Sequence, residues 1–149
     1  MKAFHFRLQT KLDITIRQEQ LAREELQLRI IERDQIQSEL DRALDGLERL
    51  EQSIRNFDLK KHNFQELLIL KDYVPVIKKL IKELETKLAQ AEQKLEEARK
   101  ILLERIRETR TLEKLKEKEW EAYLHELSLE EQKVIDEIAI NNHYRKNIS

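Results

Sequence analysis

Glycine, proline and cysteine are nearly missing from this chain of 149 residues, which has one Gly, one Pro and no Cys. Tight turns draw on Gly for positive φ and on Pro for a fixed φ, so a chain that lacks both must run in a few long elements. The lack of cysteine excludes disulfide bonds and thiolate chemistry. Glu, Lys, Leu, Arg and Gln are abundant instead, and these residues favour long helices. We therefore predict an all-α fold.

An excess of one charge is also missing, because 29 Lys and Arg are balanced by 30 Asp and Glu. Such a balance argues against a nucleic-acid partner, whose phosphates require a basic surface. The longest aliphatic run, Leu67 to Leu70, is far shorter than the ~20 residues that span a bilayer. The N-terminus reaches charged residues before an apolar stretch can form. We expect neither a classical signal peptide nor a membrane span, and no direct membrane insertion.

Two stretches carry apolar residues at alternating intervals of three and four, the pattern of a coiled-coil seam. The first comprises Ile36, Leu40, Ala43, Leu47, Leu50, Ile54 and Phe57. The second comprises Ile77, Ile81, Leu84, Leu88, Ala91, Leu95, Ala98 and Leu102. The second seam loosens at Arg105 and Thr109, and we expect it to resume in a shifted register. The residues of the shifted register are Trp120, Leu124, Leu127, Val134 and Ile138.

The gap between the two patterns sets the expected helix boundaries. We predict an antiparallel two-helix coiled-coil hairpin, a single domain over 1–149, with helix 1 over about 3–57 and helix 2 over about 76–146. A short helical connector is expected near residues 58–75, opened by a capping box of Asn63 and Glu66. Pro75 is tolerated in the first turn of a helix and would begin helix 2.

The end of the expected helix 2 raises a question about what it packs on. Ser128 and Glu131 would fit a second capping box, but the apolar spacing continues past them and favours an unbroken helix. A fold-back near residues 66–67 places Phe4 beside about residue 129. Val134, Ile135, Ile138 and Ala139 then form an apolar stripe on a helix without a partner in its own chain.

The motifs of common enzyme and metal sites do not occur in the sequence. One glycine cannot build a phosphate-binding loop, and neither G-x-S-x-G nor H-E-x-x-H is present. The histidines, His5, His62, His125 and His143, are scattered and indicate solvated surface residues. We expect no enzyme, no catalytic, cofactor-binding or metal residues, and no cofactor.

The eight aromatic residues fall into three clusters that a hairpin would bring to its two ends. They are Phe4 and Phe6, then Phe57, Phe64 and Tyr73, then Trp120, Tyr123 and Tyr144. Buried rings can close the ends of a helix pair, and exposed rings are frequent in partner contacts. The sequence leaves both interpretations open.

Two segments, "FHFRLQTKLDITIRQEQLA" and "TLEKLKEKEWEAYLHELSLEEQKVIDEIAI", resemble the flagellar export protein FliJ family and its YscO-like relatives. The late signature of that family is matched by Leu112, Glu113, Lys114, Leu115, Glu131, Gln132, Lys133, Asp136, Glu137, Ile138 and Ala139. The resemblance covers the whole chain. It implies a non-catalytic, cytoplasmic component of the bacterial flagellar type III protein export apparatus, located peripherally at the cytoplasmic face of the cell membrane.

The resemblance also implies partners: the hexameric ring of the export ATPase, the cytoplasmic domain of the membrane export gate, and export chaperones. Loss of such a protein would abolish flagellum assembly, motility and chemotaxis. The residues expected to contact the ATPase ring are Phe4, Phe6, Trp120, Tyr123, Val134, Ile135 and Ile138. Those expected to contact the gate, at the hairpin tip, are Tyr73, Ile77, Leu80 and Leu84, although Ile77 and Leu84 also belong to the predicted seam.

Two other functions fit the same sequence. The first is a structural coiled-coil tether that dimerises through its seams, for which no hairpin is needed. Light scattering separates it from a hairpin, which predicts a monomer of 18.1 kDa. The second is the equivalent stalk of a virulence type III secretion system. Only the neighbouring genes would distinguish this stalk from a flagellar one.

Overall fold

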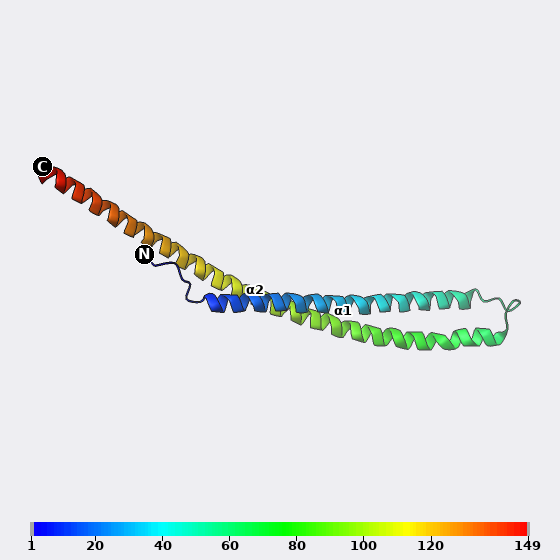
Figure 1. Cartoon of the computed structure of the whole chain (residues 1–149). Helices are drawn as coiled ribbons and strands as arrows, with labels where there is room; N and C mark the ends of the chain where they lie inside the picture. The colour runs from blue at the N-terminus through cyan, green and yellow to red at the C-terminus, as the bar shows by residue number, and fades with distance from the viewer. Residues whose placement is uncertain (1, 149) are drawn as a thin grey trace. The chain divides into compact units, whose positions relative to one another are not determined.

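The computed structural model describes residues 2–148, and these residues form two long helices that pack against each other (Figure 1). Helix α1 spans Gln9–Arg55 and helix α2 spans Phe64–Ile148. No strand occurs among the described residues. The predicted all-α fold with two packed helices is confirmed, as is the unbroken passage of α2 through Ser128.

The packing divides the chain into two compact units, and each contains part of both helices. The hairpin unit comprises Leu21–Leu103, and the terminal unit comprises the residues up to Gln20 together with those from Glu104 onward. The prediction of a single domain over 1–149 stays a prediction.

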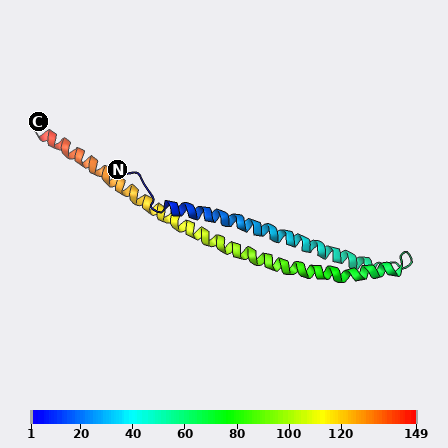
Figure 2. The ribbon, with the colours of Figure 1, turned by 60° about the horizontal axis from the view of Figure 1, so that its bottom comes forward.

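The hairpin unit holds its two helix segments together along the predicted seams. Leu40 of α1 and Ile81 and Leu84 of α2 are buried in one cluster. Half-buried residues that pack against this cluster are Ala43, Leu47, Ile77 and Leu88. Figure 2 shows the two segments side by side in this unit. Burial of one apolar side per helix stabilises helices that propensity alone would leave marginal.

The connection between the helices is shorter than predicted and is not helical. Residues 56–63 form a turn in which the Asp58 carbonyl accepts hydrogen bonds from the N–H groups of Lys61 and His62, both at 3.1 Å. The Glu66 N–H donates to Oδ1 of Asn63 at 2.9 Å. The predicted cap at Asn63 is therefore confirmed, but the helix that it begins is α2 and not a separate connector helix. The predicted helical connector over 58–75 and the start of helix 2 near 76 are wrong.

Pro75 lies inside α2, in the twelfth position from Phe64. Proline inside a helix lacks the N–H that would bond the carbonyl of Lys71, and its ring crowds that carbonyl, at a cost of about 3 kcal/mol. The helix nevertheless continues because the residues on either side are anchored by packing. Leu67, Leu70, Val74 and Ile77 are partly buried at intervals of three and four. This packing outweighs the local preference of proline, which explains why the boundary predicted there does not exist.

The terminal unit begins with an extended stretch, not with the helix predicted from about residue 3. Residues 2–6 are not helical, and the Gln9 N–H donates to the Phe6 carbonyl at 3.0 Å at the helix start. Phe6 is only 3% exposed and lies in a cluster with Leu12 and Leu112. An extended backbone lets neighbouring aromatic side chains reach different parts of α2. Packing of these rings therefore prevails over helix propensity at the N-terminus.

The seam of α2 keeps its original register in the terminal unit, contrary to the predicted shift. Thr109 and Leu112 are buried at the next two seam positions after Arg105, and Thr15 is buried on α1. A buried hydroxyl is costly unless it is hydrogen-bonded. The Thr109 hydroxyl donates to the carbonyl of Arg105 at 3.0 Å and that of Thr15 to Lys11 at 2.8 Å. Threonine thus satisfies its own hydroxyl within the helix and can occupy a core position.

Among the described residues, no helix is both long and apolar enough to cross a membrane.

Candidate interaction surfaces

An aromatic cluster in the terminal unit joins the N-terminal stretch to α2. Phe4 lies against Trp120 and Tyr123, with ring centroids 5.1 Å and 5.5 Å away. Trp120 and Tyr123 stack on each other with centroids 5.5 Å apart. The Tyr123 hydroxyl donates a hydrogen bond to the carbonyl of Lys2 at 3.0 Å. The predicted meeting of the first and third aromatic clusters is therefore confirmed for Phe4, Trp120 and Tyr123.

The pairing at this end corrects the predicted register. Phe4 was expected beside residue 129, but its neighbours Tyr123 and Trp120 lie six and nine residues earlier (129 − 123 and 129 − 120). The cause is the position of the turn, because residues 56–63 precede the predicted fold-back at 66–67. The N-terminal stretch therefore covers α2 only as far as Tyr123.

Beyond the aromatic cluster, α2 continues as a helix whose side chains are exposed. Every residue from 128 to 148 is exposed, and we name this segment the C-terminal extension. Val134, Ile135 and Ile138, which we name the extension stripe, are each more than half exposed. The prediction that this stripe has no partner among the described residues of its own chain is confirmed.

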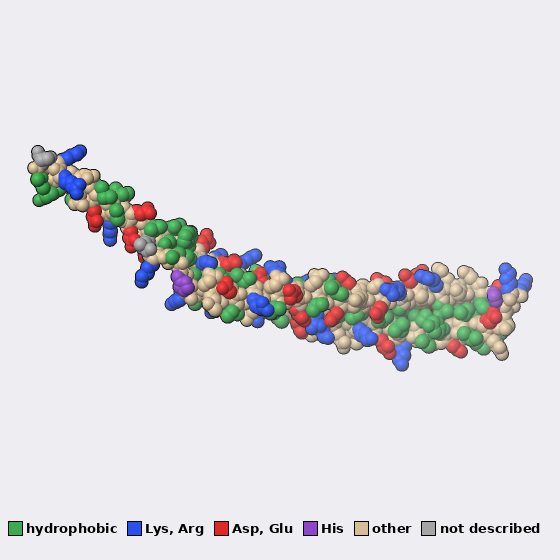
Figure 3. Space-filling model, in the orientation of Figure 1, with side chains coloured by type: hydrophobic (Ala, Val, Ile, Leu, Met, Phe, Trp, Pro, Cys, Tyr) green, Lys and Arg blue, Asp and Glu red, His purple; other side chains and the backbone are tan. Residues whose placement is uncertain are grey.

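Val134 and Ile138 of the extension stripe prolong the face that Phe4 covers, and Ile135 lies beside it. At about 100° per residue, the positions of Tyr123, Leu127, Val134 and Ile138 fall within an arc of about 60°. A shallow hollow of about 450 Å³ lies on this face, lined by Leu127, Glu130, Glu131, Val134 and Ile135. Figure 3 shows hydrophobic side chains along this part of α2. A seam that is covered at one end and open at the other can receive a further helix or an apolar surface.

The hairpin unit exposes a second apolar stripe near its turn. Ile69, Tyr73, Val76 and Leu80, which we name the tip stripe, recur at intervals of four, three and four and are all exposed. Tyr73 and Leu80 were predicted as contact residues from the sequence. Ile69 and Val76 were missed, although the same heptad spacing could have found them.

Three of the predicted contact residues belong instead to the interior. Phe6 is buried against Leu12 and Leu112, and Leu84 is 4% exposed in the core of the hairpin unit. Ile77 packs against the same core. The spacing of apolar residues did not distinguish the buried seam of α2 from the exposed tip stripe, because both sets of residues recur with the period of a helix. The assignment of Phe6, Ile77 and Leu84 to partner contacts is therefore corrected.

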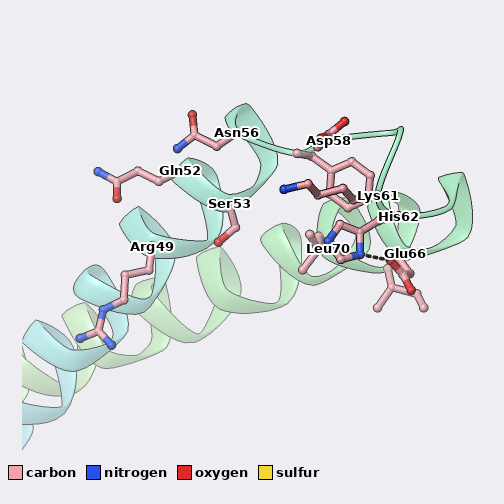
Figure 4. Close-up of a pocket in the computed structure, with 11 residues that line it drawn as sticks. Arg49, Gln52, Ser53, Asn56, Asp58, Lys61, His62, Glu66 and Leu70 are labelled. Atoms are coloured by element: carbon pink, nitrogen blue, oxygen red, sulfur yellow. Dashed lines mark ion pairs between the residues drawn. The ribbon is translucent and has the colours of Figure 1, made fainter.

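An open depression of about 950 Å³ lies beside the turn of the hairpin unit. Figure 4 shows Arg49, Gln52, Ser53 and Asn56 along its α1 side and His62 and Glu66 on the opposite side. His62 Nδ1 and Glu66 form an ion pair at 3.0 Å when the imidazole is protonated. Both partners are largely exposed, so this pair contributes little to stability.

The described residues contain no group of three or more His, Asp or Glu side chains that could hold a metal ion. The extension stripe and the tip stripe are exposed and apolar, which suits contacts with other macromolecules.

Comparison with known proteins identifies the family of this helical pair. The family described as "Flagellar FliJ protein" matches residues 4–147. No curated protein and no solved structure gave a match. The family match includes the aromatic stretch at Phe4 and almost the whole C-terminal extension. The extension stripe and the tip stripe therefore both lie within the matched residues. The chain therefore belongs to the flagellar FliJ family and is a component of the flagellar type III protein export apparatus.

Proposed function

We propose that this protein is a non-catalytic stalk that docks in the ring of the flagellar export ATPase through its C-terminal extension. The supporting observation is the extension stripe, whose side chains prolong a packed seam but are exposed in the described chain. An isolated amphipathic helix gains most of its stability from the surface on which it packs. The family match provides the apparatus in which such a surface would be found.

The contact residues at this end are Trp120, Val134, Ile135 and Ile138, with Phe4 and Tyr123 in a supporting position. Trp120 keeps 42% of its surface exposed although Phe4 packs on it. Large aromatic and aliphatic side chains that are exposed in one protein are frequent anchors of its complexes. Phe4 and Tyr123 hold the indole in place and thereby reduce the entropy lost on binding.

The stalk would act on the ATPase by differential binding. A single helix inside a ring of several subunits contacts each subunit differently. A ligand that binds one subunit conformation better than another shifts the population toward the first. The stalk would therefore increase the fraction of ATPase assembled into rings and the rate of ATP hydrolysis, without taking part in the chemical step.

The tip stripe is the proposed contact with the cytoplasmic domain of the membrane export gate. Its four side chains are exposed and border the core of the hairpin unit without belonging to it. A protein that holds the ATPase with one surface and the gate with another would be cytoplasmic and peripheral to the membrane. Export chaperones are further partners that the family implies, and loss of the protein would abolish motility and chemotaxis.

Co-elution with the cognate export ATPase tests this proposal. We expect a shared peak in size-exclusion chromatography and faster ATP hydrolysis when the protein is added. Separate peaks together with an unchanged hydrolysis rate would refute the proposal. Light scattering on the protein alone should give a monomer of 18.1 kDa, whereas a tether that dimerises through its seams would give twice that mass.

The proposed gate contact has its own test with a matched control. Tyr73→Ala/Leu80→Ala removes two exposed side chains of the tip stripe, and Ile101→Ala/Leu103→Ala removes two exposed apolar side chains elsewhere in the hairpin unit. We expect only the first variant to lose binding to the cytoplasmic domain of the gate. Equal binding by both variants would show that the tip stripe is not the contact.

A further inference from the structure

Positive charge is concentrated around the turn of the hairpin unit. Residues 49–82 contain eight Lys and Arg and four Asp and Glu, which gives a net charge of +4 (8 − 4). The whole chain has a net charge of −1, so the remaining residues sum to −5 (−1 − 4). The balance that describes the whole chain therefore does not describe this end of the hairpin unit.

One face of α2 carries much of this charge, and we name it the basic face. Its residues are Phe64, Leu68, Lys71, Lys78, Lys79 and Lys82, all of which are exposed. At about 100° per residue these positions fall within an arc of about 100°. Of the carboxylates of the same stretch, Glu66 falls about 120° outside that arc and Asp72 lies at its border, about 20° beyond Lys79. From Phe64 to Lys82 the face extends for about 27 Å along the helix.

The lysine side chains of this face have no carboxylate partners within residues 2–148. Neither these four lysines nor Lys60 and Lys61 in the adjoining turn take part in an ion pair there. Lysines that are already paired would lose their partners on binding an anionic surface. These lysines are solvated, and no existing pair opposes such binding.

Two apolar side chains share the face with the lysines. Phe64 is 61% exposed at the first residue of α2, and Leu68 lies one turn further along. Lysines attract the phosphates of anionic lipids, and exposed aromatic and aliphatic side chains between them can add apolar contact at the interface. The long lysine side chains reach the headgroup phosphates while the apolar groups contact the layer beneath.

We propose that the basic face binds the headgroups of an anionic phospholipid bilayer. The basic face carries lysines as its only charged residues, and its six residues are exposed and lie outside the core of the hairpin unit, so it is accessible to a membrane surface. A nucleic-acid duplex would place Phe64 and Leu68 against phosphates, which gives these side chains no apolar contact. This interaction goes beyond the proposed docking to the ATPase and gate, because it needs neither partner.

The tip stripe and the basic face occupy different sides of the same helix segment. At about 100° per residue, Tyr73 and Leu80 lie about 160° or more from Lys71 and Lys82, and the nearest pair across the two faces, Val76 and Lys79, is about 60° apart. Contact with lipid through one side therefore leaves the other side accessible to a protein. The lipid contact would orient the hairpin unit at the membrane surface.

Vesicle co-sedimentation of the full chain alone provides the test. Vesicles of phosphatidylcholine mixed with phosphatidylglycerol are compared with vesicles of phosphatidylcholine only. The first variant is Lys71→Glu/Lys78→Glu/Lys82→Glu. Its matched control, Lys87→Glu/Lys94→Glu/Lys100→Glu, makes the same change in net charge at three exposed lysines elsewhere in the hairpin unit. Circular dichroism checks that each variant is helical, and Lys71→Gln/Lys78→Gln/Lys82→Gln repeats the test without introducing carboxylates.

We expect the unmodified chain to sediment with the anionic vesicles only, and to be released when salt is raised from ~0.1 M to ~1 M. The loss of three lysines should weaken the partitioning by about 100-fold, while the control stays within a few fold of the original. Absence of sedimentation with anionic vesicles would overturn the proposal. Equal losses in both variants, or equal binding to neutral vesicles, would also overturn it. Because the assay contains no ATPase, its failure would leave the docking proposal unaffected, and the reverse also holds.

Discussion

The ring of Phe4 lies edge-on to the indole of Trp120, with centroids 5.1 Å apart and an angle of 72° between the planes. This contact, together with that of Phe4 and Tyr123, lies where the cover of α2 by the N-terminal stretch ends. Trp120 is the only tryptophan in the chain, so the fluorescence of tryptophan reports on the surroundings of this one indole, to which Phe4 and Tyr123 belong. The end of the packed region of the terminal unit can therefore be followed directly in solution.

Phe4→Ala should shift the Trp120 emission to longer wavelength, because water replaces the ring. Edge-to-face pairs contribute about 0.5–1.5 kcal/mol beyond the area they bury, and we expect the free energy of unfolding to fall by about 1–3 kcal/mol. Urea unfolding followed by tryptophan fluorescence measures both effects. Phe64→Ala, which removes an exposed ring in the hairpin unit, is the control. An emission spectrum unaltered by Phe4→Ala would contradict the contact.

Gly46→Ala should stabilise the protein. Gly46 lies inside α1, and a Cβ atom placed there would have no atom within 4 Å, so alanine fits without a clash. Glycine inside a helix costs about 0.5–1 kcal/mol relative to alanine, and we expect a gain of that size. Thermal unfolding followed by circular dichroism measures it. A lower melting temperature would mean that the position is more crowded than the structure shows.

Asn63→Ala should weaken the start of α2. The substitution removes the acceptor for the Glu66 N–H, and the loss of such a cap costs about 1 kcal/mol. Hydrogen exchange at the Glu66 amide should become faster, which isolates the local effect. Asn63→Asp keeps an acceptor and serves as the control. Equal exchange rates in the alanine and aspartate variants would argue against the cap.

Pro75→Ala should make α2 more stable by up to about 3 kcal/mol, since alanine restores the bond to the Lys71 carbonyl and removes the ring. The expected readout is a higher urea midpoint with an unchanged slope, which indicates that the folded structure is the same. Because Pro75 lies on the side of α2 that also carries the basic face, the vesicle assay on this variant checks that lipid binding persists. A lower urea midpoint for Pro75→Ala would contradict this prediction, because it would mean that the proline ring stabilises the folded helix.

The sequence predicted those features that depend on helical periodicity. Leu40, Ile81 and Leu84 form the core of the hairpin unit as their spacing requires, and Asn63 caps a helix as its type and position indicate. These features are local or repeat regularly, so they can be read without knowledge of the partner helix.

The sequence did not predict features that depend on which residues meet across the two helices. Pro75 lies within a continuous helix in which Leu70 and Val74 are partly buried and Ile77 packs on the core of the hairpin unit, and helix propensity does not include the contribution of this packing. Phe6 is buried while Phe4 retains partial exposure, although both are N-terminal phenylalanines in the same stretch. The difference arises from their packing on α2, which a pattern along one helix does not contain.

Val134→Asp/Ile138→Asp tests most directly whether the extension stripe docks in the ring of the export ATPase. The control is Ile140→Asp/Tyr144→Asp, which changes two exposed apolar residues at the same spacing on another side of the extension. Affinity for the ATPase is measured for both variants, and circular dichroism is recorded for each. We predict nearly unchanged helicity in both and a loss of affinity of more than about 100-fold in the first variant only, since each buried anchor contributes about 2 kcal/mol or more. Affinity that survives Val134→Asp/Ile138→Asp, or that falls equally in the control, would contradict docking through the extension stripe.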